Sequence, residues 1–562
     1  MTSLPGIVLV LGALILPLLK GNLRKAALLA LPVLSFVHLM GLPDDYTLNA
    51  TLFGLNLELV RIDKLSMVWG IVFHIAALLS AIYALHEEDV VQLVAGLMYA
   101  GAAIGAAFAG DLVTLFVYWE LTAITSVFLI WANRTEAAFR TGMRYLVIQV
   151  GSGVLLLAGL ILHYADTGSI AFGHLGLVST GTMLIFIAFG IKAAFPFLHN
   201  WLQDSYPQGT VVGTVFLSAY TTKLAIYALA RGFAGESILI PIGAVMTLFP
   251  IFFAVIENDL RRVLAYSLNN QLGYMVVGIG IGTELALNGT AAHAFAHIIY
   301  KGLLFMSMGA VLHRTGTMKA SELGGLYKSM PWTTAFCIVG SLSISGFPLF
   351  SGFVSKSMVL TAGADGHMLW LSVALLVASA GVVDHSGIKI PFFAFFAHDS
   401  GRRVKEAPLN MLIAMGAAAL ICIVIGVRPG LLYAILPYAV EYVPYTASHV
   451  MFSLQLLMFA ALAFALMMRH GLYPPEVRSV NLDFDWTYRK GLPALVGGLE
   501  RVGGAVWSGA LTLGRSAVDE VIGLVAHAHR PGSGVFGEPW PASLAAKWVA
   551  LVLGVTLILW YL

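Results

Sequence analysis

The segment GIKAAFPFLHNW, residues 190–201, is the most informative part of this sequence, because it places Phe-Pro among small residues inside an apolar run. A second segment, SGFPLFSGFVSK at 345–356, repeats the arrangement. Proline lacks an N–H and its ring clashes with the preceding helical turn, so Pro196 and Pro348 predict two broken helices. Each break frees the backbone carbonyl four residues earlier, which lipid does not tolerate and a hydrated cavity inside a protein does.

The composition around these segments is that of a membrane protein. Of the 562 residues, 59% are hydrophobic and 11% are charged, whereas soluble domains carry roughly 25% charged residues. The 58 glycines agree, because glycine lets membrane helices approach closely. A net charge of +2 predicts no binding of nucleic acid. The first apolar run has no positive charge before it, so we expect a retained span rather than a signal peptide.

Apolar runs of about 20 residues define the expected spans. They predict an all-α polytopic membrane protein with about 14–16 transmembrane helices. The runs lie near residues 5–20, 26–42, 66–85, 90–109, 111–132, 141–163, 181–198, 208–230, 237–256, 263–283, 289–312, 331–358, 367–397, 408–428, 447–468 and 543–562.

The loops between these spans differ in charge from one side to the other. One side carries fourteen basic residues: Lys20, Arg24, Lys25, Arg134, Arg140, Arg144, Arg261, Arg262, Arg314, Lys319, Lys328, Arg402, Arg403 and Lys405. The other carries four: Arg61, Lys64, Arg231 and Arg428. Because basic residues stay in the cytoplasm, the rich side is predicted to be cytoplasmic and both termini to lie outside. We expect the plasma (inner) membrane of a prokaryote.

The two broken spans are the seventh and twelfth, so they predict an internal repeat of five spans. An odd number of spans inverts the second unit relative to the first, as in many transporters. The predicted organisation is N-terminal helices at 1–110, a first repeat at 90–230, an inverted repeat at 237–397 and further helices at 408–468. A cytoplasmic-side amphipathic segment at 470–540 and a final helix at 543–562 follow. The alternative is chance recurrence of a common dipeptide.

The segment at 470–540 contains apolar residues at helical spacing, with charges elsewhere around the helix. The apolar positions are Leu495, Leu499, Val502, Val506, Leu513, Ala517, Val521 and Leu524. We expect a helix along the membrane surface or a neighbouring subunit. The alternative is a simple tether to the last span.

Ionisable residues inside spanning helices cost several kcal/mol, roughly 2.5–3.5 on insertion scales, so they indicate function. The ionisable set of this chain is Glu120, Lys192, Lys223, His293, His297, Lys301, Lys356 and Lys389. One acid together with lysines and histidines on consecutive spans indicates a proton relay. A lysine whose acidic partner moves away can load and release a proton, and histidine titrates near neutrality. No catalytic residue, cofactor or metal site is expected.

Structural explanations compete with this hypothesis. A buried salt bridge could account for the first three members of the set, although such bridges rarely gain net stability. His293 and Lys301 could serve packing or an interface, and Lys389 could extend toward the cytoplasmic end of its helix. Loop-anchoring pairs are expected among Glu257, Asp259, Arg261 and Arg262.

Several ordered motifs between about residues 65 and 400 are similar to those of the antiporter-like membrane subunits of respiratory complex I and of Mrp-type cation/proton antiporters. They are YWE at 118–120, GIKAAFPFLHNWLQDSYP at 190–207, Lys223, DLRRVLAYSLNNQLGYM at 259–275, HAFAHIIYKGLLF at 293–305, ELGGL at 322–326 and GFPLFSGFVSK at 346–356. From residue 380 onward, the chain resembles the Mrp-type D subunits most. Gln203 departs from the family pattern, in which proline is usual.

The resemblance implies roles for particular residues. Glu120 and Lys192 would form the switching pair, and Lys223, His297 and Lys356 would conduct the proton. Lysine at the last position is one of two family options, the other being glutamate. The C-terminal helices would dock to sister subunits.

Three functions fit these residues. The first is the proton-translocating subunit of a multisubunit sodium/proton antiporter, with H⁺, Na⁺, sister membrane subunits and the lipid bilayer as partners. The others are the proton-pumping arm of a complex I-like or membrane hydrogenase redox enzyme, and a proton-conducting subunit for inorganic-carbon uptake. The chain has no phosphate-binding loop and no cluster or haem motif, so it is expected to be a transporter subunit rather than an enzyme.

Overall fold

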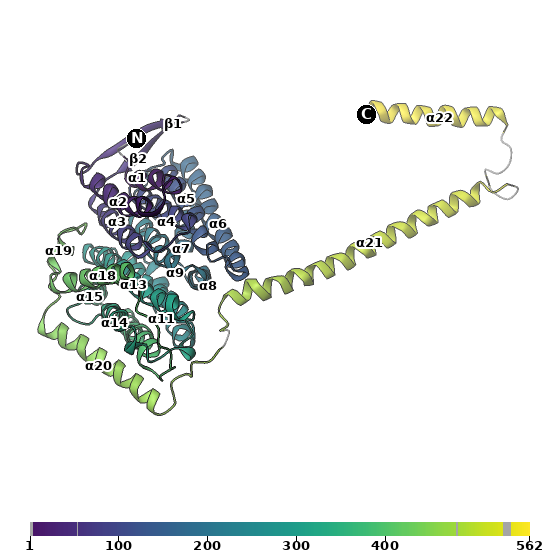
Figure 1. Ribbon diagram of the computed structural model, residues 1–562. Helices are drawn as coiled ribbons and strands as arrows, with labels where there is room; N and C mark the ends of the chain where they lie inside the picture. Colours follow the sequence, from purple (N-terminus) through teal and green to yellow (C-terminus); the bar gives the residue numbers. More distant parts are fainter. Residues whose placement is uncertain (1–3, 53, 479–480, 532–534, 536–540) are drawn as a thin grey trace. The chain divides into compact units, whose positions relative to one another are not determined.

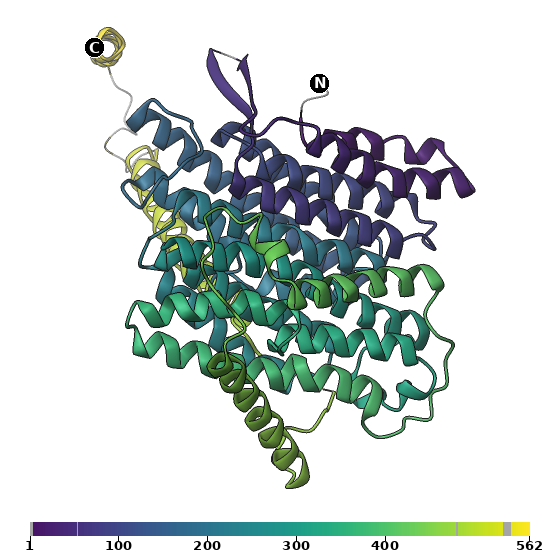
Figure 2. The same cartoon turned by 90° about the vertical axis from the view of Figure 1, so that its left-hand side faces the viewer.

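The computed structural model describes residues 4–52, 54–478, 481–531, 535 and 541–562. It divides into two compact units, Met1–Asn481 and Leu482–Leu562. The first unit is a bundle of helices that run roughly side by side (Figures 1 and 2). Within the described residues, twelve helices are long and apolar enough to cross a membrane. The expected polytopic helical fold is therefore confirmed.

The N-terminal part contains α1 (Ile7–Ala13), the 3₁₀ turn η1 (Leu16–Leu18), α2 (Gly21–Met40) and α3 (Lys64–Tyr83). Between α2 and α3 lies a hairpin of β1 (Thr47–Leu52) and β2 (Leu55–Arg61), which was not predicted. Backbone hydrogen bonds from β2 to the loop after α4 tie this hairpin to the bundle.

The first five-span unit begins with α4 (Val90–Ala107), α5 (Leu112–Trp131) and the long α6 (Glu136–Thr167). The broken span follows as α7 (Thr180–Lys192), α8 (Asn200–Ser205) and η2 (Tyr206–Gln208). The last span is divided at residue 220 into α9 (Val211–Ala219) and α10 (Thr221–Gly232).

The second five-span unit has the same order of elements as the first. It comprises α11 (Leu239–Ile256), α12 (Leu260–Ile281), the long α13 (Glu284–Thr315), the turns η3 (Ala320–Glu322) and η4 (Leu326–Lys328), and the broken span α14 (Pro331–Ser345) and α15 (Ser351–Asp365). Its last span joins α16 (Leu369–Val382), a π-helical turn η5 (Val383–Ile388), α17 (Lys389–Pro391) and a second π turn η6 (Phe392–Phe396).

The repeat extends to individual backbone hydrogen bonds. Leu112 N donates to Ile170 O at 2.9 Å, and Leu260 N donates to Met318 O at 3.0 Å. Each residue of the second bond stands 148 positions after its counterpart. The N-caps Asp111 and Asp259, the bounds of α6 and α13, and the left-handed glycines 168 and 316 keep the same offset. The backbone thus uses one scaffold twice.

At both breaks, residues on either side of the proline also leave the helical conformation. Ala194 and Phe197 have positive φ angles of 60° and 70° around Pro196, and Gly346 and Leu349 have 75° and 77° around Pro348. Left-handed residues end a helix whatever follows them. The breaks predicted from proline are therefore present, and each is fixed by two further residues.

The C-terminal part of the first unit contains α18 (Leu409–Val427), α19 (Gly430–Tyr433) and α20 (Ala447–Arg469). The second compact unit, Leu482–Leu562, contains η7 (Thr487–Gly491), α21 (Leu492–Ala528) and α22 (Ala542–Tyr561). The predicted amphipathic segment is thus a helix of 37 residues. Most predicted spans coincide with one helix or a pair of helix fragments, whereas the span predicted at 367–397 consists of four, α16, η5, α17 and η6. Twelve long apolar helices lie in the described residues, fewer than the 14–16 expected.

Loops predicted to share one face of the membrane contact one another. Arg144 pairs with Asp204 and Lys328 with Asp399, at 2.7 and 2.8 Å. Hydrogen bonds from Arg403 and Lys328 hold the pKa of the Asp399 carboxyl well below its ordinary value.

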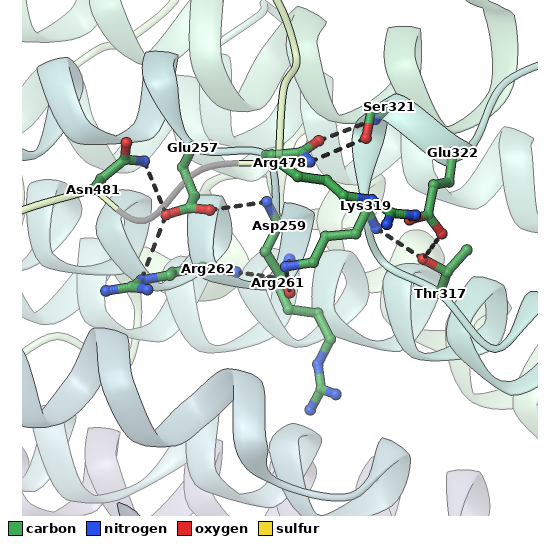
Figure 3. A network of polar contacts seen from close by, with 11 residues as sticks. Glu257, Asp259, Arg261, Arg262, Thr317, Lys319, Ser321, Glu322, Arg478 and Asn481 are labelled. Atoms are coloured by element: carbon green, nitrogen blue, oxygen red, sulfur yellow. Dashed lines mark hydrogen bonds and ion pairs between the residues drawn. The ribbon is translucent and has the colours of Figure 1, made fainter. Parts of the chain in front are cut away.

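Figure 3 shows the charged loops of the second five-span unit on this face, where Lys319 pairs with Asp259 at 3.1 Å. Arg262 lies 3.5 Å from Glu257, so one pair among the four expected residues is present, whereas the partner of Asp259 is Lys319, which was not expected. Arg261 instead donates to the carbonyls of Gly209 and Tyr206, because it is buried among them.

Candidate functional site

Glu120 lies on α5, and its carboxylate points at α6. A methyl group added to Gly153 would come within 1.5 Å of Oε1 and 2.5 Å of Cδ, so the missing side chain of this glycine makes room for the carboxylate. Oε1 is buried and has no hydrogen-bond partner in the part of the chain that the structure describes. Unpartnered buried oxygens are rare and occur at hydrated or functional positions. The carboxylate therefore lies in a groove made for it without being fixed there.

Lys192, the last residue of α7, is fully buried and reaches the same helix as Glu120. Its Nζ donates to the carbonyl of Trp119 at 2.6 Å and to the hydroxyl of Thr122 at 3.1 Å, and it lies 4.3 Å from the Trp119 ring centre. Lys192 is the charged group that acts on the Glu120 carboxylate. Since neither of its hydrogen bonds goes to that carboxylate, the expected pair is adjacent but open.

Hydroxyl groups lead from Lys192 toward the next lysine. Thr122, which accepts from Lys192, lies one turn before Ser126 on α5. Ser126 is 2.8 Å from the hydroxyl of Tyr145, and Tyr145 also bonds Thr221. Hydroxyls both donate and accept, so they can pass a proton along a chain. The sequence analysis did not identify these residues, because neutral hydroxyl side chains are common in membrane helices.

Lys223 follows the point at which α9 and α10 separate. Its Nζ donates to the carbonyl of Ser218 at 2.6 Å, and its own carbonyl accepts from the indole of Trp69 at 2.9 Å. The division of the span at Tyr220 interrupts the helical ladder and leaves carbonyls for such side chains. Lys223 is thus held by backbone oxygen rather than by an acid.

Three members of the ionisable set lie on α13, near the middle of the bundle. Among the described residues, His297 has no hydrogen-bond partner on either ring nitrogen, and Lys301 has none on Nζ. Both are fully buried, and the charged groups that act on His297 are Lys223, Lys301 and His293. His293 lies one turn away, with its ring centre 6.2 Å from that of His297. These side chains connect the two five-span units.

Lys356 stands after the second break, on α15. Its Nζ lies 3.3 Å from the carbonyl of Ile344, the group that Pro348 leaves without a helical donor. Lys356 lies close enough to His293 for its charge to act on the imidazole. Ser355, the residue before Lys356, is hydrogen-bonded to the His293 ring at 3.2 Å.

A cavity of about 270 Å³ adjoins Lys356, between α15, α16 and α20. Serines 345, 357 and 379 line it together with His449. Most of the remaining lining is apolar, so polar groups occupy only part of the wall of this cavity. Lys356, the last carrier predicted from the sequence, therefore borders a cavity that contains several polar side chains.

Lys389, on α17, lies at the end of α11. Its Nζ donates to the carbonyls of Val255 and Glu257 at 2.6 and 2.8 Å. Lys389 is fully buried and its amine also lies 2.7 Å from Oε1 of Glu476, so its charge is held inside the protein rather than at the surface. Two residues that the sequence analysis overlooked, Asp384 and His385, lie nearby in the π turn, and His385 interacts with Lys301, Lys389 and Lys356. His385 therefore joins Lys389 to the rest of the set.

Backbone carbonyls are the common partners of these lysines. Four of the five buried lysines in the set donate to one, and Lys301 is the exception. A carbonyl accepts from an ammonium and from a neutral amine alike, whereas a carboxylate favours only the charged form. Such partners suit a lysine that must change its protonation state.

The repeat relates the two halves of the site. With the offset of 148 residues, Tyr145, Gln149 and Gly153 on α6 correspond to His293, His297 and Lys301 on α13. One helical face thus carries neutral groups against Glu120 in the first unit and basic groups in the second.

These features define a class of protein: a polytopic helical bundle with two five-span units and a buried line of ionisable groups that passes through both. A family model described as NADH:quinone oxidoreductase/Mrp antiporter, TM matches residues 109–380. Residues 109–380 of the chain match this family of antiporter-like membrane subunits, which complex I and Mrp antiporters share. The resemblance inferred from the motifs is confirmed.

Individual relatives agree with this assignment. The chain is similar to the D subunit of the Na(+)/H(+) antiporter of Alkalihalophilus pseudofirmus, with 32% identity over 313 residues that cover 52% of this chain and 63% of the relative. The chain therefore spans less than two thirds of the length of this curated relative. Two solved structures share the fold: the Mrp complex from Dietzia sp. (TM-score 0.65, 20% identity, 84% and 95% coverage) and respiratory complex I from Thermus thermophilus (TM-score 0.70, 21%, 81% and 100%).

Proposed function

We propose that this chain is the proton-translocating subunit of a multisubunit sodium/proton antiporter, using the ionisable set as its relay. The observation that carries the proposal is the succession of buried titratable and hydroxyl groups from Glu120 to Lys389. Isolated charges at such depth cost several kcal/mol each, and no packing role requires so many of them. The similarity to the D component of a sodium/proton antiporter supports this assignment over other members of the family.

The geometry suggests how the relay works. With Glu120 in the groove at Gly153, Lys192 is held by carbonyl and hydroxyl groups and can give up its proton to the hydroxyl chain. When the carboxylate swings toward Lys192, the ammonium form is favoured and the lysine reloads. Lys223, His297 and Lys356 then carry the proton in turn, since each lies within electrostatic reach of a neighbour.

The proposal includes sister subunits and a membrane orientation. We propose that α21, with its apolar stripe, docks to such subunits or the membrane surface, and that the termini lie on the outer side of a prokaryotic plasma membrane. The unequal number of basic residues on the two sides supports the orientation.

Replacing Glu120 with Gln tests the function, because the amide keeps the size and removes the charge. In vesicles that contain the assembled complex, we expect sodium-driven proton movement to fall at least tenfold, a typical minimum for a group that transfers protons. Glu136→Gln is the matched control, since Glu136 is 71% exposed and pairs only with Arg140 in the described structure. Full activity of the Glu120→Gln complex would contradict the proposal.

A redox-driven pump is the second candidate, because the fold of complex I aligns over 100% of its matched chain. The proteins that co-purify with this chain discriminate the two. Six small membrane proteins would support the antiporter, iron–sulfur subunits would support the redox pump, and a carbon-hydrating partner would support inorganic-carbon uptake.

A further inference from the structure

After α20 the chain turns back along the bundle through residues 471–478, here called the strap. Tyr473 anchors it by packing its ring 5.0 Å from Phe464 on α20 and 6.2 Å from Phe393. Tyr473 is only 6% exposed although the strap has no helix or strand. The strap is therefore a packed element of the first unit.

Glu476 carries the strap's charge into the interior. Its side chain is 6% exposed, and its Oε1 lies 2.7 Å from Nζ of Lys389, which is fully buried. An ion pair with so little exposure is rarely a gain in stability over apolar packing. This contact brings an acid to the last basic residue of the ionisable set from outside the two five-span units.

The charges around this pair do not balance. Acids come from three further elements or turns: Glu257 before α12, Asp384 in η5 and Glu476 itself in the strap. The basic groups facing them are Lys389 and Arg262, and Arg262 lies 3.5 Å from Glu257. Because three acids face two basic groups, the cluster carries one excess negative charge, which a proton on one of the acids would neutralise. Tyr473 and His385 are the other titratable neighbours.

The far end of the strap reaches the charged loops of Figure 3. Arg478 is 79% exposed and lies 2.7 Å from Glu322, and Asn481 donates to Glu257 at 3.3 Å. Two residues along the chain from Arg478, Glu476 is already buried. The strap thus connects the loop surface with Lys389 over a short distance.

Capping of the end of α11 by Lys389 does not explain why the carboxylate of Glu476 is buried beside this lysine. Lys389 already donates to two carbonyls at the end of α11, which satisfies a helix terminus without any carboxylate. Burial raises the pKa of Glu476 and Lys389 opposes the rise, so this carboxyl is poised to exchange a proton.

We propose that Glu476 is a proton-carrying residue that transfers protons between the loop surface of Figure 3 and Lys389, so that the second five-span unit has its own Glu–Lys pair. In the transfer, the O–H bond of the Glu476 carboxylic acid breaks and an N–H bond forms on the neutral Lys389 amine, leaving the ion pair. Asp384 and His385 receive the proton next. This inference rests on the proposed function.

Glu476→Gln and Glu476→Asp test it in vesicles that contain the assembled complex. The glutamine variant should lower sodium-driven proton movement about tenfold or more, and aspartate should restore part of it because it keeps the acid. Arg478→Gln is the structural control, since it releases the surface end of the strap and leaves the acid in place. We expect this control to stay within about twofold of the unsubstituted chain.

Three results would overturn the inference. The first is unchanged proton flux with an unchanged pH profile in Glu476→Gln. The second is an equal loss of flux in Arg478→Gln, which would make the strap only structural. The third is a Glu476→Asp variant that assembles but is as inactive as Glu476→Gln. If the glutamine variant does not assemble, the aspartate variant alone decides, with reduced flux expected and full flux contradicting. Loss of flux in Glu120→Gln alongside normal Glu476→Gln would refute this inference alone, whereas normal flux in Glu120→Gln would refute the proposed function.

Discussion

Gly153→Ala probes the position of the Glu120 carboxylate without removing it. The new methyl would lie 1.5 Å from Oε1, and ordinary van der Waals contact begins at 3.4 Å, so the carboxylate must shift by about 1.9 Å. The atoms that clash are the far end of a flexible side chain, and alanine favours a helix by about 1 kcal/mol over glycine. We therefore expect α6 to fold normally while the carboxylate loses its groove.

The electrostatic consequence is large enough to measure. Moving a carboxylate about 2 Å relative to an ammonium, for instance from about 6 to about 4 Å, changes their interaction by ~1.4 kcal/mol at an effective dielectric constant of 20. That energy is a tenfold change in the proton affinity of Lys192. We expect proton movement in vesicles to fall by about this factor.

A control on the same helix makes the test specific. Gly151→Ala adds the same methyl two residues away, where nothing lies within 4 Å. Glu120→Asp in the Gly153→Ala background shortens the acid by one methylene and should recover part of the flux. Equal activity of the two alanine variants would refute the idea that the groove at Gly153 positions the acid.

Two further predictions concern the hydroxyl chain and the second break. Tyr145→Phe should slow proton movement several-fold without loss of assembly, because it removes the hydroxyl between Ser126 and Thr221. Tyr164→Phe, on the exposed end of the same helix, should have no effect. Equal rates of proton movement in the two variants would contradict the role of the hydroxyl groups. Gly352→Ala should lower the amount of folded protein, measured by thermal stability in detergent, because its methyl would lie 1.8 Å from the carbonyl of Ser343 and overpacking costs about 1–3 kcal/mol. Gly363→Ala on the same helix meets only ordinary contacts, and matching stabilities would show the reasoning to be wrong.

The sequence predicted the helical fold and its repeat because each depends on local signals. Apolar runs mark spans, and Phe-Pro marks the breaks wherever they fall. The left-handed conformations of Phe197 and Leu349 were not foreseen, since neither residue type favours positive φ. The β1–β2 hairpin was not predicted, although Gly54 lies between two alternating segments, because its strands are far shorter than the apolar runs of about 20 residues that mark spans.

For the site, the sequence identified the ionisable residues but not their contacts. Glu120 and Lys192 were expected to pair, yet Gly153 gives the acid another place, and a glycine on a different helix carries no sequence signal for that. Asp384 and His385 lay within a predicted span, so the same cost argument would have identified them. Glu476 could not be found this way, because its partner stands far away in the chain and only folding brings them together.

The offset of 148 residues between α6 and α13 also serves as a key for protein engineering. Because the two helices share their length and their caps, a side chain from one can be transplanted to the other without redesigning the backbone. Placing histidine at 149 would give the acidic half an imidazole where the basic half has His297. Such chimaeric halves would let the contribution of each residue type be separated from the frame that carries it.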